Sequence, residues 1–194
     1  MKLDIERMSG YGCYLIDGYQ VNYLFGLDDI CKKFINDDSL VLELGSNDGV
    51  STSLFSKYAK NVTAVDILFT NKMSLLLNTV DNIDFYNMNF NEFYDKYKNC
   101  KYDLIYIDGS HEYVDVREDI IKFKNLIKEN GVICGHDYNS ACPGVIRAVN
   151  EIFGEENIKI YSDSSWVVDY YGHWLGSKKA VDEYILEQKL DLEI

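Results

Sequence analysis

The sequence predicts an α/β fold: a Rossmann-like seven-stranded sheet with helices on both faces and a C-terminal antiparallel hairpin strand. Three observations support this prediction. After residue 38, short apolar runs alternate with amphipathic stretches, as in parallel sheets whose strands are joined by helices. Polar residues follow several of these runs directly. The last two runs are separated only by a short Ser/Asp turn, which indicates a hairpin.

The elements follow from these runs in chain order. A first apolar strand ends in a glycine-containing turn that opens a helix, and a second, Val62 to Val65, ends in Asp66. Apolar residues from Val116 to Ile127 recur at helical spacing, and Asn130-Gly131 would stop that helix. We expect strands over 39–44, 62–66, 83–87, 102–107, 131–135, 157–161 and 165–170. The expected helices cover 50–59, 71–80, 90–98, 113–129, 144–153 and 178–190.

The 194 residues fit a single domain. Residues 1–38 break the strand–helix pattern and are rich in Tyr and Gly, which predicts an N-terminal cap or packing arm, with a lid over the substrate as the alternative. The core is expected over 39–170, and residues 171–194 form a C-terminal tail.

Composition narrows the class of partner. The net charge of −13 argues against nucleic acid, because phosphate binding needs clustered Lys and Arg. Five scattered cysteines form no zinc spacing and suggest reduced thiols. No stretch approaches the roughly 18 apolar residues of a membrane helix, and the N-terminus has no apolar signal core. We therefore expect a cytoplasmic protein without a membrane partner.

The first strand–helix turn is the strongest indication of a ligand site. Its spacing is E-x-G-x-x-x-G from Glu43 through Gly45 to Gly49, which differs from the G-x-G-x-x-G of dinucleotide sites. Glycines let the backbone approach a ligand closely, and the helix that follows presents free N–H groups. Asp48 would repel a pyrophosphate. Glu43 and Asp48 instead favour a cationic or zwitterionic ligand.

This arrangement resembles the class I S-adenosylmethionine-dependent methyltransferases, over roughly residues 39–170. The resemblance implies S-adenosyl-L-methionine as cofactor, with the first loop against its methionine and ribose and Asp66 on the ribose hydroxyls. Asp66 as the N-cap of the next helix is the alternative. The cofactor-binding residues implied are Glu43, Gly45, Ser46, Asn47, Gly49, Asp66, Asn89 and Asp108.

A second group of polar residues follows two later strands. Asp108 and His111 come after the strand at 102–107, and His136 and Asp137 come after the strand at 131–135. Ligands of open α/β sheets sit beyond the carboxyl ends of the strands. We therefore expect these four residues to converge beside the cofactor as the catalytic group.

The segments D-G-S-H-E-Y and N-G-V-I-C-G-H-D-Y resemble a subgroup that includes sugar and small-molecule O-methyltransferases. Two mechanisms follow. In one, His111 or His136 is the general base for a substrate hydroxyl. In the other, Asp108 and Asp137 hold a divalent metal that activates that hydroxyl. The structural alternative is that His111 caps a helix and His136 bonds backbone. His173 is expected at the surface or at an interface.

Several functions remain open. The first is O-methylation of a hydroxyl on a carbohydrate or glycoconjugate, so that a small molecule or glycan is the acceptor. Methylation of a non-sugar small molecule and a non-catalytic adenosyl-binding module are alternatives. A nicotinamide-dependent dehydrogenase is disfavoured by Asp48 and the missing third glycine. A homodimer is compatible with the sequence.

Overall fold

The computed structural model describes residues 14–16, 19–21, 24–168 and 186. The helix expected over 178–190, His173 and the C-terminal tail therefore lie outside the described residues, apart from residue 186. The strands are β1 (Tyr14–Ile16), β2 (Tyr19–Val21), β3 (Leu40–Leu44), β4 (Asn61–Asp66), β5 (Ile83–Asn87), β6 (Tyr102–Ile107), β7 (Ile127–Gly135), β8 (Ile158–Ile160) and β9 (Trp166–Val168). The helices are α1 (Phe25–Phe34), α2 (Val50–Phe55), α3 (Asn71–Leu77), α4 (Phe90–Tyr97), α5 (Tyr113–Phe123) and α6 (Pro143–Phe153), with 3₁₀ turns at Lys124–Leu126 and Glu155–Asn157.

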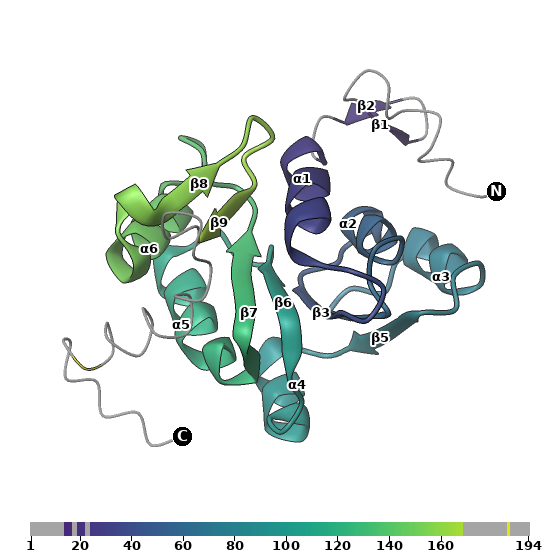
Figure 1. The fold of residues 1–194 in the computed structure, drawn as a ribbon. Coiled ribbons are helices and arrows are strands. Elements are labelled where there is room, and N and C mark those ends of the chain that lie inside the picture. The colour runs from purple at the N-terminus through teal and green to yellow at the C-terminus, as the bar shows by residue number, and fades with distance from the viewer. Residues whose placement is uncertain (1–13, 17–18, 22–23, 169–185, 187–194) are drawn as a thin grey trace.

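The predicted seven-stranded sheet is confirmed, with strand order β5-β4-β3-β6-β7-β9-β8 (Figure 1). The strands from β5 to β7 pair in parallel, whereas β9 is antiparallel to both β7 and β8. The strand order reverses between β3 and β6. This reversal opens the crevice in which α/β proteins bind their ligands.

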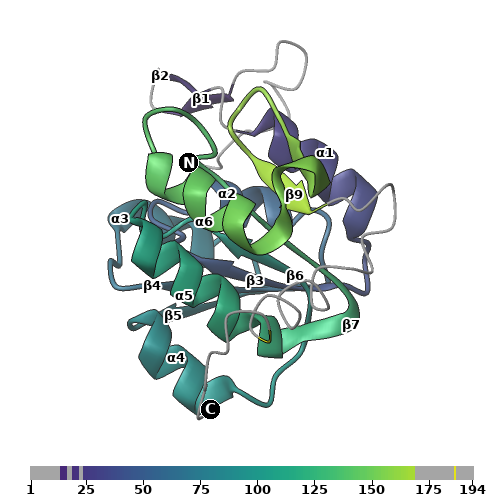
Figure 2. The same ribbon diagram turned by 90° about the vertical axis from the view of Figure 1, so that its left-hand side faces the viewer.

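The sheet separates two hydrophobic clusters, so helices cover both of its faces (Figures 1 and 2). One cluster joins the sheet to α1, α2 and α3, and includes Leu27 and Phe55. The other joins it to α4, α5 and α6, and includes Phe93, Phe123 and Trp166. Strands buried on both faces are expected to be almost continuously apolar, as β3 and β6 are.

The helix predicted over 113–129 is too long, and the predicted stop at Asn130-Gly131 is wrong. α5 ends at Phe123, a 3₁₀ turn follows, and β7 already begins at Ile127. Ile127 pairs with Tyr102 of β6, and the register shifts before Leu104. Gly131 lies inside β7, where a Cβ atom would be 2.7 Å from Cγ1 of Ile127. The glycine therefore permits a close approach within the strand.

The N-terminal helix is attached to the far edge of the sheet. Asp163, in the turn between β8 and β9, accepts hydrogen bonds from the amides of Gly26 (2.5 Å) and Leu27 (3.2 Å) at the start of α1. The carboxylate satisfies amides that have no partner within the helix. Within the ranges described, no helix combines the length and the apolar character needed to cross a bilayer.

Candidate active site

The loop after β3 is shaped by backbone that only small residues tolerate well. Gly45 has φ +94°, and a Cβ atom there would lie 2.1 Å from the carbonyl oxygen of Asp108. Asn47 and Gly49 also have positive φ, 42° and 81°. The chain thus turns sharply before α2 and lies directly against the end of β6. This contact joins the first loop to the polar residues that follow β6.

Glu43 connects this loop to α2 through hydrogen bonds and does not line the cavity. Its side chain is fully buried, and its two carboxylate oxygens accept hydrogen bonds from the hydroxyls of Ser51 and Thr52 in α2. Burial raises the pKa of Glu43 to about 7, although the two hydroxyls oppose the shift. Asp48 forms an ion pair with Lys72 (3.1 Å). Both acids therefore have partners within the protein. Gly49, at the end of the same loop, packs against Leu76 of α3.

Asp66 lies beside the same loop, at the carboxyl end of β4. One carboxylate oxygen accepts from the amide of Asn47 and the other from the amide of Leu68, both at 2.8 Å. Each oxygen keeps capacity for a further hydrogen bond. The N-cap of α3 is Thr70, whose hydroxyl accepts from the amide of Met73, so Asp66 is not the helix cap.

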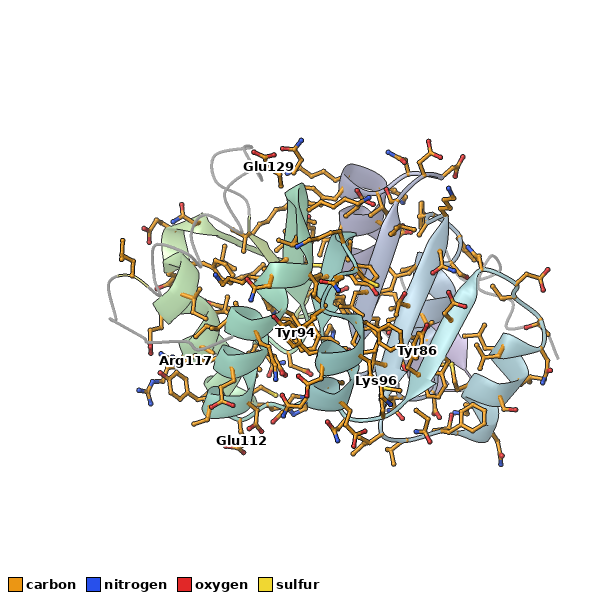
Figure 3. The ribbon with its side chains drawn as sticks, turned by 90° about the horizontal axis from the view of Figure 1, so that it is seen from below. Tyr86, Tyr94, Lys96, Glu112, Arg117 and Glu129 are labelled. Carbon is orange, nitrogen blue, oxygen red and sulfur yellow. The ribbon has the colours of Figure 1, made fainter. Side chains whose placement is uncertain are left out.

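These residues border a large cavity beyond the carboxyl ends of the strands. Its volume of about 1470 Å³ exceeds the roughly 300–1,000 Å³ of a typical small-molecule site. Predicted residues along its wall are Gly45, Ser46, Asn47, Asp66, Asn89, Asp108, His111, His136 and Asp137. The cavity extends along α4 and α5, and its wall includes Tyr94 of α4 and Arg117 of α5, both labelled in Figure 3.

A buried hydroxyl points to a ligand in this cavity. Oγ of Ser46 is inaccessible to solvent and has no hydrogen-bond partner in the part of the chain that the structure describes. A buried polar group without a partner is unfavourable. The side chains of Ile67 and Leu68 line the same wall and are 68% and 56% exposed. A ligand with an apolar ring and hydrogen-bonding groups would satisfy both observations.

The four residues predicted to be catalytic converge around Asp137. One of its carboxylate oxygens lies 2.8 Å from Nε2 of His111, and the other lies 3.3 Å from Nδ1 of His136. Asp108, His136 and Asp137 also offer ligand atoms within 4.8 Å of one another. Asp137 has φ +60°, a left-handed conformation that is uncommon for a residue with a side chain. The backbone thus directs its carboxylate between the two imidazoles.

The charges of this group influence one another strongly. Burial raises the pKa of Asp108 to about 8, and Asp137 adds to the shift while His136 opposes it. The hydrogen bond with His136 is the main cause that lowers the pKa of Asp137. Burial alone would lower the pKa of His136, but its hydrogen bond to Asp137 and the charge of Asp108 raise it. Asp137 is thus the ionised centre of the group, and Asp108 is a carboxyl group that titrates near neutral pH.

The structural alternatives for the two histidines do not describe their side chains. At the start of α5, the hydroxyl of Ser110, and not the side chain of His111, accepts a hydrogen bond from the amide of Glu112. The imidazole of His136 faces Asp137, and the hydrogen bond from Nε1 of Trp166 (3.1 Å) is accepted by the backbone carbonyl of His136.

Sequence reasoning missed three contributors to this region. Ile67 and Leu68 follow Asp66 directly, and apolar residues just beyond a strand end were the available signal. Cys142, which precedes α6, offers a ligand atom within 4.8 Å of those of His111 and Asp137. No residue spacing in the sequence predicts that Cys142 lies near His111 and Asp137, because this contact depends on how α6 packs.

Comparison with known proteins gives a family match and a shared fold. The sequence model of a family described as "Methyltransferase domain" matches residues 42–138. An uncharacterised protein of Acanthamoeba polyphaga mimivirus is 29% identical over 153 residues, which are 70% of this chain and 69% of that protein.

Two solved structures are similar at low sequence identity. An rRNA methylase from Streptococcus thermophilus has a TM-score of 0.58 and 17% identity, covering 75% of this chain and 93% of its own. A TDP-rhamnose 3′-O-methyltransferase of calicheamicin biosynthesis has a TM-score of 0.59 and 10% identity, covering 76% and 78%. These likenesses show the fold, and the acceptors of the two proteins, rRNA and TDP-rhamnose, differ widely.

Proposed function

Since the chain belongs to the methyltransferase domain family, and is thus an S-adenosylmethionine-dependent methyltransferase, we propose that it methylates a hydroxyl of a carbohydrate or glycoconjugate. The observation that supports this most directly is the carboxylate of Asp137 placed between His111 and His136. This arrangement can remove a proton from a hydroxyl, which is what O-methylation requires. It borders the same cavity as the glycine loop.

The cavity wall fits the cofactor that the family uses. Gly45 leaves the space that a Cβ atom would fill, and the carboxylate of Asp66 can accept hydrogen bonds from a pair of ribose hydroxyls. The buried hydroxyl of Ser46 would gain a partner. The exposed side chains of Ile67 and Leu68 would cover the face of an adenine ring. When bound, the cofactor supplies the sulfonium methyl group.

His136 is the general base in this proposal. Of the two histidines it is the more enclosed, with 11% of its side chain exposed against 53% for His111. The charge of Asp108 also raises the pKa of His136. The backbone carbonyl of Asp108 lies against Gly45 in the loop after β3. An imidazole whose Nδ1 is held by a carboxylate takes up a proton at Nε2. Nε2 of His136 is buried in this structure, so the acceptor hydroxyl reaches it only when the side chains around it shift. Asp137 orients His136 and stabilises the imidazolium that forms.

A divalent metal is the second route to an activated hydroxyl. Asp108, His136 and Asp137 would hold it, and their donor atoms are close enough to share one ion. Such an ion would lower the pKa of a bound hydroxyl.

The carbohydrate acceptor is supported by the D-G-S-H-E-Y and G-H-D-Y segments and by the sugar-nucleotide acceptor of one structural neighbour. The net charge of −13 disfavours a nucleic-acid acceptor such as that of the rRNA methylase. A panel of nucleotide sugars, glycans, phenols and RNA, assayed with methyl-labelled cofactor, tests the class. Transfer only to phenols or RNA would refute the carbohydrate acceptor, and cofactor binding without any transfer would favour a non-catalytic module.

Asp66 gives a prediction about the cofactor. Replacing it by alanine or asparagine is expected to weaken S-adenosylhomocysteine binding by about 1.5–3 kcal/mol, because a charged acceptor for the ribose hydroxyls is lost. Isothermal titration calorimetry measures this change. Asp84→Asn removes a carboxylate of the same kind from the exposed side of β5 and is the matched control. Equal affinity in the Asp66 variants and in the control would disprove the ribose contact.

His136 gives a prediction about pH. The neutral imidazole is the active form, and its pKa is raised above 6.5, so kcat/KM is expected to rise with pH through a midpoint above 6.5. Asp137→Asn removes the negative charge that raises this pKa and leaves only a neutral hydrogen-bond acceptor, while burial, which lowers the pKa, remains. The midpoint should therefore move to lower pH in the variant. A midpoint at the same pH in both proteins would mean that another group limits the rate.

A further inference from the structure

A second set of potential ligand atoms lies on the outer side of the catalytic group. His111, Asp137 and Cys142 each offer one donor atom, and these atoms lie within 4.8 Å of one another. The residues come from two loops: His111 lies in the loop after β6, and Asp137 and Cys142 lie near the two ends of the loop between β7 and α6. The methyl transfer proposed above makes no use of Cys142. The set therefore calls for a separate explanation.

The backbone around these residues brings their side chains together. A Cβ atom at Gly144 would lie 2.3 Å from the carbonyl oxygen of His111, so glycine allows the first turn of α6 to pack on the His111 backbone. The segment before Cys142 is a closed turn, in which the Cys142 amide donates to the carbonyl of Asn139 at 3.0 Å. With Asp137 in its left-handed conformation, all three donors are presented from defined backbone. Metal sites need this kind of preorganisation.

The donor types select a class of ion. Imidazole nitrogen, carboxylate oxygen and thiolate sulfur together suit Zn²⁺ and similar transition metals, whereas Mg²⁺ and Ca²⁺ prefer oxygen alone. Three protein ligands also match zinc sites that keep a fourth position open.

We propose that His111, Asp137 and Cys142 form a binding site for Zn²⁺ or a similar transition-metal ion. Binding releases the thiol proton to solvent, and the ion is held by the thiolate, the neutral imidazole and the carboxylate. One carboxylate oxygen of Asp137 faces His111 and the ion, while the other still faces His136. The site differs from the Asp108–His136–Asp137 set in its sulfur ligand and in the ion it prefers. It does not depend on the identity of the methyl acceptor.

Cobalt spectroscopy of the full chain tests this site. The protein is stripped with a chelator, kept reduced with a phosphine under argon and titrated with Co²⁺. We expect one equivalent to bind, with visible d–d bands of a tetrahedral ion and a near-ultraviolet thiolate-to-cobalt charge-transfer band. Zn²⁺ should bleach both sets of bands at one equivalent, and millimolar Mg²⁺ should not.

Two cysteine variants make the test specific. Cys142→Ser should lose the charge-transfer band and bind Zn²⁺ at least about tenfold more weakly. Cys100→Ser changes an exposed cysteine after α4 and should retain the band. Circular dichroism and thermal unfolding show whether each variant is folded. No charge-transfer band in the unaltered protein, a band retained in folded Cys142→Ser, or displacement of Co²⁺ by Mg²⁺ would each overturn the proposal. Cofactor binding, measured separately, reports on the methyltransferase function alone.

Discussion

Replacing His136 by glutamine is expected to lower kcat by about 10²–10⁴-fold, the usual contribution of a general base. Glutamine is similar in size but cannot take the proton from an acceptor hydroxyl. The backbone carbonyl that receives the Trp166 hydrogen bond remains, so the end of β7 should keep its structure. Affinity for S-adenosylhomocysteine should stay within about twofold, because the glycine loop and Asp66 are unchanged.

The comparison with His111 makes this prediction specific. Initial rates with the acceptor identified in the panel give kcat, and calorimetry gives the cofactor affinity. His111→Gln alters the other imidazole on the same carboxylate and should reduce kcat less than His136→Gln does. A larger loss in the His111 variant would transfer the role of base to that residue. Near-normal rates in both variants would exclude base catalysis by either histidine.

The central sheet was predictable because its signal is local. Runs such as Val62–Val65 are apolar over their whole length, which is typical of strands buried on both faces, and the structure places each predicted strand. The hairpin could be predicted from the short turn before Trp166. In each case, the residues that specify the element belong to it.

The end of α5 was not predictable in this way. Leu126 and Ile127 continue the apolar spacing of the helix, but Ile127 pairs with Tyr102 as the first residue of β7. Apolar residues at such a junction suit a helix and a buried strand equally. The choice is made by β6, a neighbour distant in sequence, and by the close approach that Gly131 allows.

The candidate site shows the same division. The positions of Asp66, Asp108 and His136 at strand ends follow from the order of the elements, and all three line the cavity. The pairing of Asp137 with both imidazoles depends on the left-handed backbone conformation of Asp137, which no sequence motif predicts. Glu43 stands in the expected motif, yet its carboxylate bonds to α2 because the side chain points below the loop. The sequence therefore predicted which residues lie at the strand ends, but not the direction in which their side chains point.

Glu43 provides the second large effect, on stability. Its carboxyl group is fully buried, and burial raises its pKa from 4.5 to about 7. Between these two values the unfolded chain has released the proton while the folded protein still holds it. The folded state therefore binds more protons there, and this group lowers the free energy of unfolding as pH rises from 4.5 to 7. Above pH 7 the loss is complete and amounts to at most about 3 kcal/mol.

Glu43→Gln should remove this loss, because an amide does not ionise and can exchange hydrogen bonds with the hydroxyls of Ser51 and Thr52. The variant is expected to be more stable than the unaltered protein by up to about 3 kcal/mol at pH 8, and by less than about 1 kcal/mol at pH 5. Urea unfolding at both pH values measures the difference. Asp84→Asn, at an exposed position on β5, controls for the change in net charge. A stability difference that is the same at pH 5 and pH 8 would show that Glu43 titrates alike in the folded and unfolded chains, and that its two hydroxyl partners hold it ionised despite its burial.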